Sequence, residues 1–290
     1  MLANLHSLAA DARAAGVGLG AFNVIHLENA ASLVRAAELA DVPVVLQISQ
    51  NAVKYHGGQL APIALATLAI AKASSARVCV HLDHADDLEL IREALDLGFT
   101  SIMYDGSRLP DDDNRATTCK VAQWCHDRGV SIEAELGEVG GKDGVHAPGV
   151  RTDPEDARQF VADTGVDLLA VAVGSSHAMI TRDAALDLDR IRELRTTVPV
   201  PLVLHGSSGV SDENMVAAIA AGMTKINVST HLNKVFTSTV RRLLAENKTL
   251  VDSRKWQGPA HQAMQDETRR LLELYAEGPA ALRELASSAS

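Results

Sequence analysis

Short runs of apolar residues alternate along the chain with longer stretches in which apolar residues recur at helical spacing. The short runs are nearly continuous and rich in β-branched residues, which is typical of parallel strands buried on both faces. We predict eight strands, at residues 18–24, 43–49, 78–84, 101–105, 131–137, 168–174, 201–206 and 225–230.

Amphipathic segments lie between these strands. Residues 27–40 and 87–97 carry apolar side chains at helical spacing. Asp153 followed by Pro154 indicates one capped helix start, and Ser211 indicates another. Eight strand–helix repeats predict an α/β fold with a closed (β/α)8 barrel, the TIM barrel. A six-stranded doubly wound sheet is the alternative, but its glycine-rich nucleotide motif does not follow the first strand.

The chain reads as one domain. We predict a single TIM-barrel domain over residues 1–290, with the barrel over about 18–249 and a polar C-terminal helical extension over about 250–290. That extension could cover one end of the barrel or a partner chain. The loops at 137–152 and 175–187 are long for this architecture, and long loops after barrel strands are where such enzymes place moving parts.

Composition narrows the classes of partner. Lys and Arg number 27 against 37 Asp and Glu, so the net charge is −10. Such a chain lacks the basic footprint of a nucleic-acid binder, and no segment has the roughly 20 apolar residues of a membrane span. We therefore expect no nucleic-acid or membrane partner. Cys79, Cys119 and Cys125 are too few for a disulfide framework, so we expect reduced thiols and a cytoplasmic location.

Polar or ionisable side chains stand at the predicted ends of all eight strands. They are Asn23, Ser49, Asp83 with His84, Asp105, Glu135, His177, His205 and Asn227. The active site of a barrel enzyme lies at the carboxyl ends of its strands, so these residues should share one rim. A purely structural role is a poor explanation for polar side chains at all eight strand ends, since buried polar groups cost free energy unless they are paired.

Three of these residues form a candidate metal site. His84, His177 and His205 end strands three, six and seven, and three imidazoles suit Zn²⁺ with an open fourth position. A hydrogen-bonded histidine cluster without metal is the alternative. Asp83 is a candidate general acid or base or, alternatively, a helix cap. A regular strand would point it away from its neighbour His84, but at a strand end both can reach the mouth. For His81 we expect a packing role.

Two small, hydroxyl-rich sequences follow the last two strands, HGSSGV at 205–210 and NVST at 227–230. In barrels these loops often bind phosphate through backbone N–H groups and a helix N-terminus. Such a site needs no Lys or Arg, which agrees with the acidic net charge. Ordinary turn and cap chemistry is the alternative. The glycine-rich loop at 137–149 is either a mobile lid with a second acid–base group or a plain surface loop.

Seven segments between Gly20 and Arg242 are informative through their combination and their order along the chain. They are GAFNV, VHLDHADD, MYDGS, EAELGEVGG, TGVDLLAVAVG, PLVLHGSSG and TKINVST. Together they resemble the class II, zinc-dependent ketose-bisphosphate aldolases, which include fructose- and tagatose-1,6-bisphosphate aldolases. The resemblance implies a lyase of glycolysis or carbohydrate metabolism. Its substrate would be a ketose 1,6-bisphosphate, cleaved reversibly to dihydroxyacetone phosphate and glyceraldehyde 3-phosphate.

The resemblance also implies roles for individual residues. It makes His84, His177 and His205 the zinc ligands and Asp83 the proton donor at the C4 oxygen. Asp105 and Glu135 match positions that hold a second cation, and Asn23 and Ser49 match substrate contacts. The implied phosphate-binding set is Ala178, Gly206, Ser207, Ser208, Asn227, Val228, Ser229 and Thr230. A monovalent cation (Na⁺ or K⁺) near the phosphate and a homodimer or homotetramer are also implied.

Some positions depart from the family pattern. Ala178 stands where glycine is usual, and Asp143 is the nearest substitute for the lid glutamate that would move the C3 proton. Arg269 or Arg270, from this chain or a partner subunit, is a candidate for the far phosphate. Two other readings stay open: an aldolase relative acting on a different phosphorylated keto-sugar, and a non-catalytic barrel subunit that binds zinc and phosphate.

Overall fold

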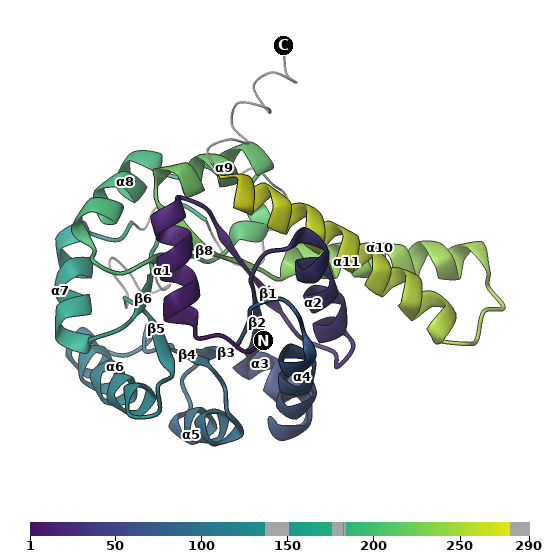
Figure 1. The fold of residues 1–290 in the computed structure, drawn as a ribbon, viewed down its shortest axis with the longest axis horizontal. Coiled ribbons are helices and arrows are strands. Elements are labelled where there is room, and N and C mark those ends of the chain that lie inside the picture. The colour runs from purple at the N-terminus through teal and green to yellow at the C-terminus, as the bar shows by residue number, and fades with distance from the viewer. Residues whose placement is uncertain (137–150, 176–181, 183, 279–290) are drawn as a thin grey trace, which may run out of the picture.

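The eight predicted strands form a closed parallel barrel (Figure 1). A computed structural model describes residues 1–136, 151–175, 182 and 184–278. Each strand pairs with the next in sequence, and β8 closes the barrel on β1. The strands are β1 (Leu19–Asn23), β2 (Val44–Ser49), β3 (Val78–Ala85), β4 (Ser101–Tyr104), β5 (Ser131–Glu135), β6 (Leu168–Ala170), β7 (Leu202–Leu204) and β8 (Met223–Val228). The TIM-barrel prediction is confirmed.

Helices surround the barrel (Figure 1). Those between β1 and β8 are α2 (Asn29–Ala40), α3 (Gln50–Tyr55), α4 (Ala61–Ala73), α5 (Leu88–Leu97), α6 (Asp111–His126), α7 (Pro154–Thr164), α8 (Leu188–Thr197), the 3-10 turn η1 (Ser207–Gly209) and α9 (Asp212–Ala221). The two predicted caps are confirmed, because the side chains of Asp153 and Ser211 accept backbone hydrogen bonds at the starts of α7 and α9.

The bounds of all eight strands differ by a few residues from the predicted ones, and β6 and β8 illustrate the difference. β6 ends at Ala170. The amide of Val171 still donates to the Val203 carbonyl oxygen of β7 at 3.3 Å, but the amide of Ala172 donates to Thr152 Oγ1 at 2.8 Å. Gly174 then adopts a φ of 115°, and a Cβ there would lie 2.4 Å from the carbonyl oxygen of Ala185. β8 begins two residues earlier than predicted, at Met223.

The N-terminal helix α1 (Leu5–Ala15) was not predicted from the apolar pattern. It lies across one end of the barrel (Figure 1). Its buried Leu5 and Leu8 pack with the first residues of several strands, among them Leu19 and Val45. Since these residues start their strands, α1 closes the amino end of the barrel and leaves the carboxyl end for the site.

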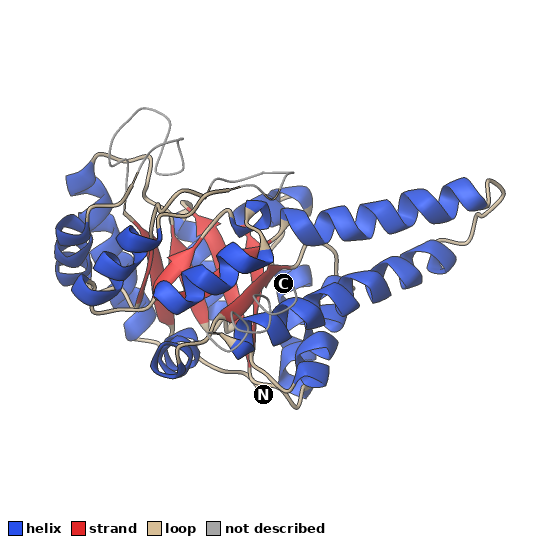
Figure 2. Cartoon of the chain, turned by 90° about the horizontal axis from the view of Figure 1, so that it is seen from above, coloured by secondary structure: helices blue, strands red, loops and turns tan. Residues whose placement is uncertain are grey.

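After β8 the chain forms a helical arm. α10 (Thr230–Glu246) and α11 (Arg254–Glu277) project together from the barrel (Figures 1 and 2). α11 then returns and packs against α2, α9 and β1. Its Leu271, Leu272 and Tyr275 are buried there. The place between α9 and α2 in the helix ring is thus filled by the second helix after β8, not the first.

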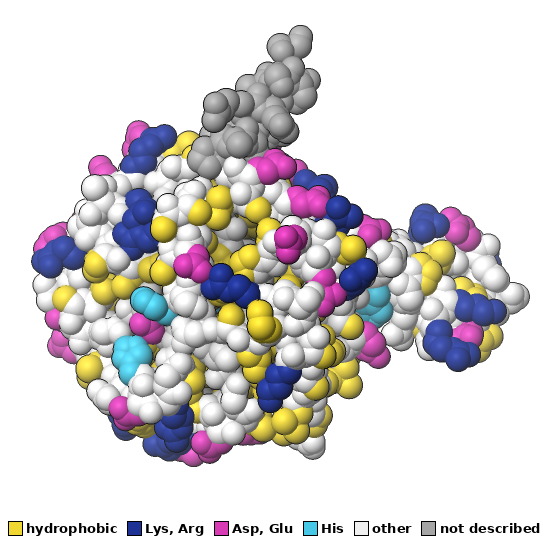
Figure 3. Space-filling model, viewed as in Figure 1, with side chains coloured by type: hydrophobic (Ala, Val, Ile, Leu, Met, Phe, Trp, Pro, Cys, Tyr) yellow, Lys and Arg dark blue, Asp and Glu magenta, His cyan; other side chains and the backbone are white. Residues whose placement is uncertain are grey.

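The surface carries charges of both signs. In the view of Figure 3, Lys and Arg side chains are interspersed with Asp and Glu. Within the described ranges, no helix combines the length and the apolar character that crossing a bilayer requires.

Candidate active site

A bulge near the end of β3 brings two adjacent side chains to the mouth of the barrel. The pairing of β3 with β4 shifts register between Leu82 and Ala85, and His84 adopts a positive φ of 46°. This left-handed conformation is uncommon for a residue with a side chain and often marks a functional position. Because it breaks the strand alternation, Asp83 and His84 both reach residues of the carboxyl-end rim, as expected for the end of this strand.

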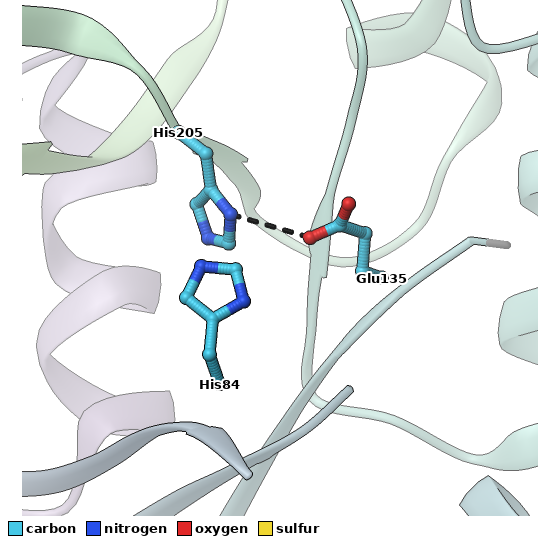
Figure 4. A group of neighbouring side chains, drawn as sticks. All are labelled: His84, Glu135 and His205. Carbon is cyan, nitrogen blue, oxygen red and sulfur yellow. Dashed lines mark ion pairs between the residues drawn. The ribbon is translucent and has the colours of Figure 1, made fainter. Parts of the chain in front are cut away.

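Two imidazoles and a carboxylate form a compact group (Figure 4). The potential ligand atoms of His84, Glu135 and His205 all lie within 4.8 Å of one another. His205 Nδ1 lies 3.3 Å from Glu135 Oε2, and the ring centroids of the two histidines are 4.7 Å apart. His84 Nδ1 pairs with Asp105 Oδ2 at 2.7 Å.

The electrostatics of this group suit a cation. Burial alone would lower the pKa of His84, but Asp83, Asp105 and Glu135 outweigh it and raise that pKa to about 10. Burial also opposes charge on His205, yet neighbouring carboxylates raise its pKa as well. Carboxylates that hold protons on two imidazoles would also stabilise a divalent cation in their place. Two histidines and a carboxylate are a donor set that Zn²⁺ accepts, so these residues fit a metal ion.

Asp83 stands beside this group with one oxygen tethered. Its Oδ2 accepts a hydrogen bond of 3.1 Å from Asn23 Nδ2, while Gln47 Nε2 donates to Asn23 Oδ1 at 3.3 Å. Asp83 Oδ1 is buried and has no hydrogen-bond partner among the residues that the structure describes. Burial would raise the pKa of Asp83, but His84 and Lys225 hold it below its ordinary value. The geometry is that of an oriented, ionised acid–base group. Ser49, which pairs with Asp83 in the sheet register, caps α3.

The loops after β7 and β8 are joined to each other. Gly206 has a φ of 67° and leads into η1. Ser207 Oγ donates to the carbonyl oxygen of Asn227, and the amide of His231 donates to Ser208 Oγ at 3.2 Å. Asn227 Oδ1 is buried without a hydrogen-bond partner in the described part of the chain. Val228 and Ser229 lead directly into α10, which starts at Thr230, so its N-terminal N–H groups favour an anion here.

Charged side chains of α11 brace these loops. Glu267 Oε1 lies 2.7 Å from His231 Nε2, and Arg270 bonds both Glu267 and Asp212 at 2.7 Å. Arg182 also bonds Asp212, and it lines a small pocket together with Ser207, Ser208 and His231. Of the candidates for the far phosphate, Arg270 is therefore engaged in this network, and Arg269 pairs with Glu273.

Several predicted residues lie outside the described ranges: His177, Ala178 and Asp143. Of the predicted histidine triad, the structure thus brings together His84 and His205. It adds Glu135, which the resemblance assigned to a second cation, to the same group.

Sequence reasoning did not single out Glu133 and Lys225, although both are fully buried in the barrel and lie 2.8 Å apart. A signal existed, because Glu133 precedes Glu135 by two residues and strand alternation places both on one face. His81 is buried as expected for a packing role, but its Nδ1 also lies 2.8 Å from Ser101 Oγ. Cys79 and Cys125 are buried, Cys119 is exposed, and all three are free thiols.

Comparisons with known proteins show the family of this chain. Residues 3–278 match the family described as class II fructose-bisphosphate aldolase. The chain is 35% identical over 271 residues to the fructose-bisphosphate aldolase of Staphylococcus aureus strain N315, covering 92% of this chain and 95% of that one. It is 36% identical over 289 residues to the fructose-bisphosphate aldolase of Giardia intestinalis, covering 91% and 89%.

A solved structure extends the likeness to the whole fold. The YdjI aldolase from Escherichia coli K12 superposes with a TM-score of 0.84 at 28% identity, and the alignment covers 97% of this chain and 100% of that one. The family is metal-dependent and acts on sugar phosphates, and the described residues include a histidine–carboxylate group that could hold a metal ion. The chain is therefore a carbon–carbon lyase and belongs to the class II fructose-bisphosphate aldolase family.

Proposed function

We propose that this protein is a zinc-dependent aldolase that reversibly cleaves a ketose 1,6-bisphosphate to dihydroxyacetone phosphate and glyceraldehyde 3-phosphate. The observation that supports this most strongly is the grouping of His84, His205 and Glu135 beside Asp83. In the proposed site His177 completes the ligand set. A bound Zn²⁺ would act as a Lewis acid at the C2 carbonyl and stabilise the charge left when the C3–C4 bond breaks.

The protein's own groups would handle the protons. Asp83 would exchange a proton with the C4 oxygen, and Asn23 would hold the carboxylate in orientation through its 3.1 Å hydrogen bond. We assign the C3 proton to Asp143 on the loop after β5. An acid–base group must be held within hydrogen-bond reach of the atom that it protonates. The hydrogen bond from Asn23 holds Asp83 in one orientation, which supports the role of Asp83 most directly.

The phosphate of the dihydroxyacetone portion would lie on the loops after β7 and β8. Gly206, Ser207 and Ser208 would contribute from one loop, and Ala178 would contribute from the segment that follows β6 in the sequence. Asn227, Val228, Ser229 and Thr230 would contribute from the other. The bond between Ser207 and the Asn227 carbonyl supports this grouping because it holds the two loops together. We also propose a Na⁺ or K⁺ ion beside the phosphate. Asp105 and Glu135 would bind a second cation, and Ser49 would contact the substrate.

The assembly that we propose is a homodimer or homotetramer. The α10–α11 arm supports it, since the arm projects from the barrel (Figure 2). Leu244 and Val251 on this arm are exposed. Exposed large apolar side chains on a projecting element are typical of surfaces that meet another chain.

Metal removal and substrate comparison test the function together. Purified protein is treated with a chelator, dialysed, and assayed with and without Zn²⁺ on fructose 1,6-bisphosphate and tagatose 1,6-bisphosphate. We expect activity to disappear on chelation and to return with Zn²⁺, with one epimer preferred. Full activity after complete metal removal would contradict the zinc assignment. Release of dihydroxyacetone phosphate only from other phosphorylated ketoses would show that the substrate is not a ketose 1,6-bisphosphate.

A further inference from the structure

An ion pair lies in the barrel one layer beneath the candidate metal group. Lys225 Nζ is 2.8 Å from Glu133 Oε2, and both side chains are 0% exposed. Glu133 and Lys225 each precede a rim residue by two positions, Glu135 and Asn227, so they occupy the next inward-facing layer of β5 and β8. The proposed mechanism uses neither of them.

The other oxygen of Glu133 faces His205. Glu133 Oε1 lies 3.2 Å from His205 Nε2, on the side of the ring opposite the Nδ1 that faces Glu135. His81 Nδ1 lies 2.8 Å from Ser101 Oγ, and His81 Nε2 lies 3.8 Å from Glu133 Oε2. The Glu133 carboxylate is thus held by a cation on one oxygen and directed at an imidazole by the other.

Stability alone explains this pair poorly. Taking two charges out of water is expensive, and replacing a buried ion pair with apolar side chains is often neutral or stabilising. A carboxylate that accepts a hydrogen bond from the distal nitrogen of a histidine, by contrast, fixes the tautomer and the ring orientation that a metal ligand needs. Glu133 has the position that this second role requires.

We propose that Glu133 is a positioning residue that accepts the Nε2–H of His205 and thereby presents Nδ1 to the divalent ion, and that Lys225 holds the Glu133 carboxylate in place. The inference rests on the metal site of the proposed function. Removal of such a partner typically weakens metal binding 10- to 100-fold, and we expect about that loss for Glu133→Gln.

The first measurement is metal affinity. Apo protein is titrated with Zn²⁺ in competition with a chromophoric chelator, for the wild type and for Glu133→Gln. Ile132→Ala is the matched control, because Ile132 is the neighbour of Glu133 on β5, is equally buried and packs in the outer core. It should lower thermal stability while leaving zinc affinity unchanged.

A second variant guards against misfolding, since Glu133→Gln leaves Lys225 buried without its partner. In Glu133→Gln/Lys225→Met both charges of the pair are removed together, so the double variant should fold more stably than the single one. It should still bind zinc more weakly than the wild type, because an amide is a weaker acceptor than a carboxylate.

The third readout is spectroscopic and independent of turnover. In the Zn²⁺-loaded wild type, NMR of ¹⁵N-histidine-labelled protein should show His205 with a slowly exchanging Nε2 proton, identified by its loss in His205→Asn. The double variant should lose that protection. Wild-type zinc affinity together with a protected Nε2 proton in the folded double variant would overturn the inference. Failure of the wild type itself to bind a divalent ion would instead remove the proposed metal site.

Discussion

Asn23 and Asp83 are joined by a 3.1 Å hydrogen bond between β1 and β3, although β2 separates these strands in the barrel. The bond fixes one oxygen of a carboxylate that is only 4% exposed, next to two histidines. It gives a buried acidic side chain a fixed orientation.

Asp83→Asn should lower kcat about 10²- to 10⁴-fold, which is the range for losing a general acid–base group. The amide is isosteric and can still accept from Asn23, so zinc content should stay close to that of the wild type. Steady-state kinetics and metal analysis on the same preparation provide the check. A variant with normal turnover would exclude Asp83 from the mechanism.

Asp105→Asn should weaken zinc binding about 10- to 100-fold, because Asp105 Oδ2 lies 2.7 Å from His84 Nδ1 and orients that ring. Asp86→Asn is the matched control, since Asp86 bonds Gln50 at an exposed position. Competition titration with a chelator distinguishes the two variants. Equal affinities would mean that Asp105 does not orient His84.

Arg270→Met should raise KM for the phosphorylated substrate several-fold, because Arg270 links Glu267 on α11 to Asp212 at the start of α9. The free energy of unfolding should fall by only about 1 kcal/mol, because these ion pairs are partly exposed. Arg269→Met, which loses only the pair with Glu273, should change stability by no more than about 0.5 kcal/mol. Identical kinetics for both variants would mean that the Arg270 ion pairs of α11 do not affect the phosphate loops.

Stability should depend on pH through Glu267. Burial would raise the pKa of Glu267, but Arg270 and His231 outweigh it and lower that pKa from its ordinary 4.5 to about 2. A carboxyl group with a depressed pKa contributes stability above about pH 4.5, and the contribution is lost as pH falls towards 2. Urea unfolding should therefore show Glu267→Gln less stable than the wild type at pH 7, with the gap closing under acid. A gap that widened in acid would contradict this sign.

Leu8→Ala should lower the free energy of unfolding by about 2–5 kcal/mol, the usual cost of truncating a fully buried leucine. Leu8 is 1% exposed where α1 closes the amino end of the barrel, far from the carboxyl-end rim. We therefore expect unchanged kcat at temperatures where the variant is folded. A large loss of kcat would show that the amino end influences the site.

The local sequence was sufficient for the barrel and for the rim. Buried parallel strands must be nearly continuous apolar runs, so all eight could be located from the pattern alone. Strand ends follow from those runs, which is why Asp83, His84, Glu135 and His205 could be proposed before any coordinates.

Tertiary structure decided what no local pattern carries. The bulge at His84 depends on pairing with β4, and the partnership of Lys225 with Glu133 exists only because barrel closure brings β5 and β8 to one interior. Likewise α11, not α10, fills the gap in the helix ring, and α1 closes the amino end. Periodicity records which face of an element is buried, but contacts between distant segments form only when the closed barrel selects the partners.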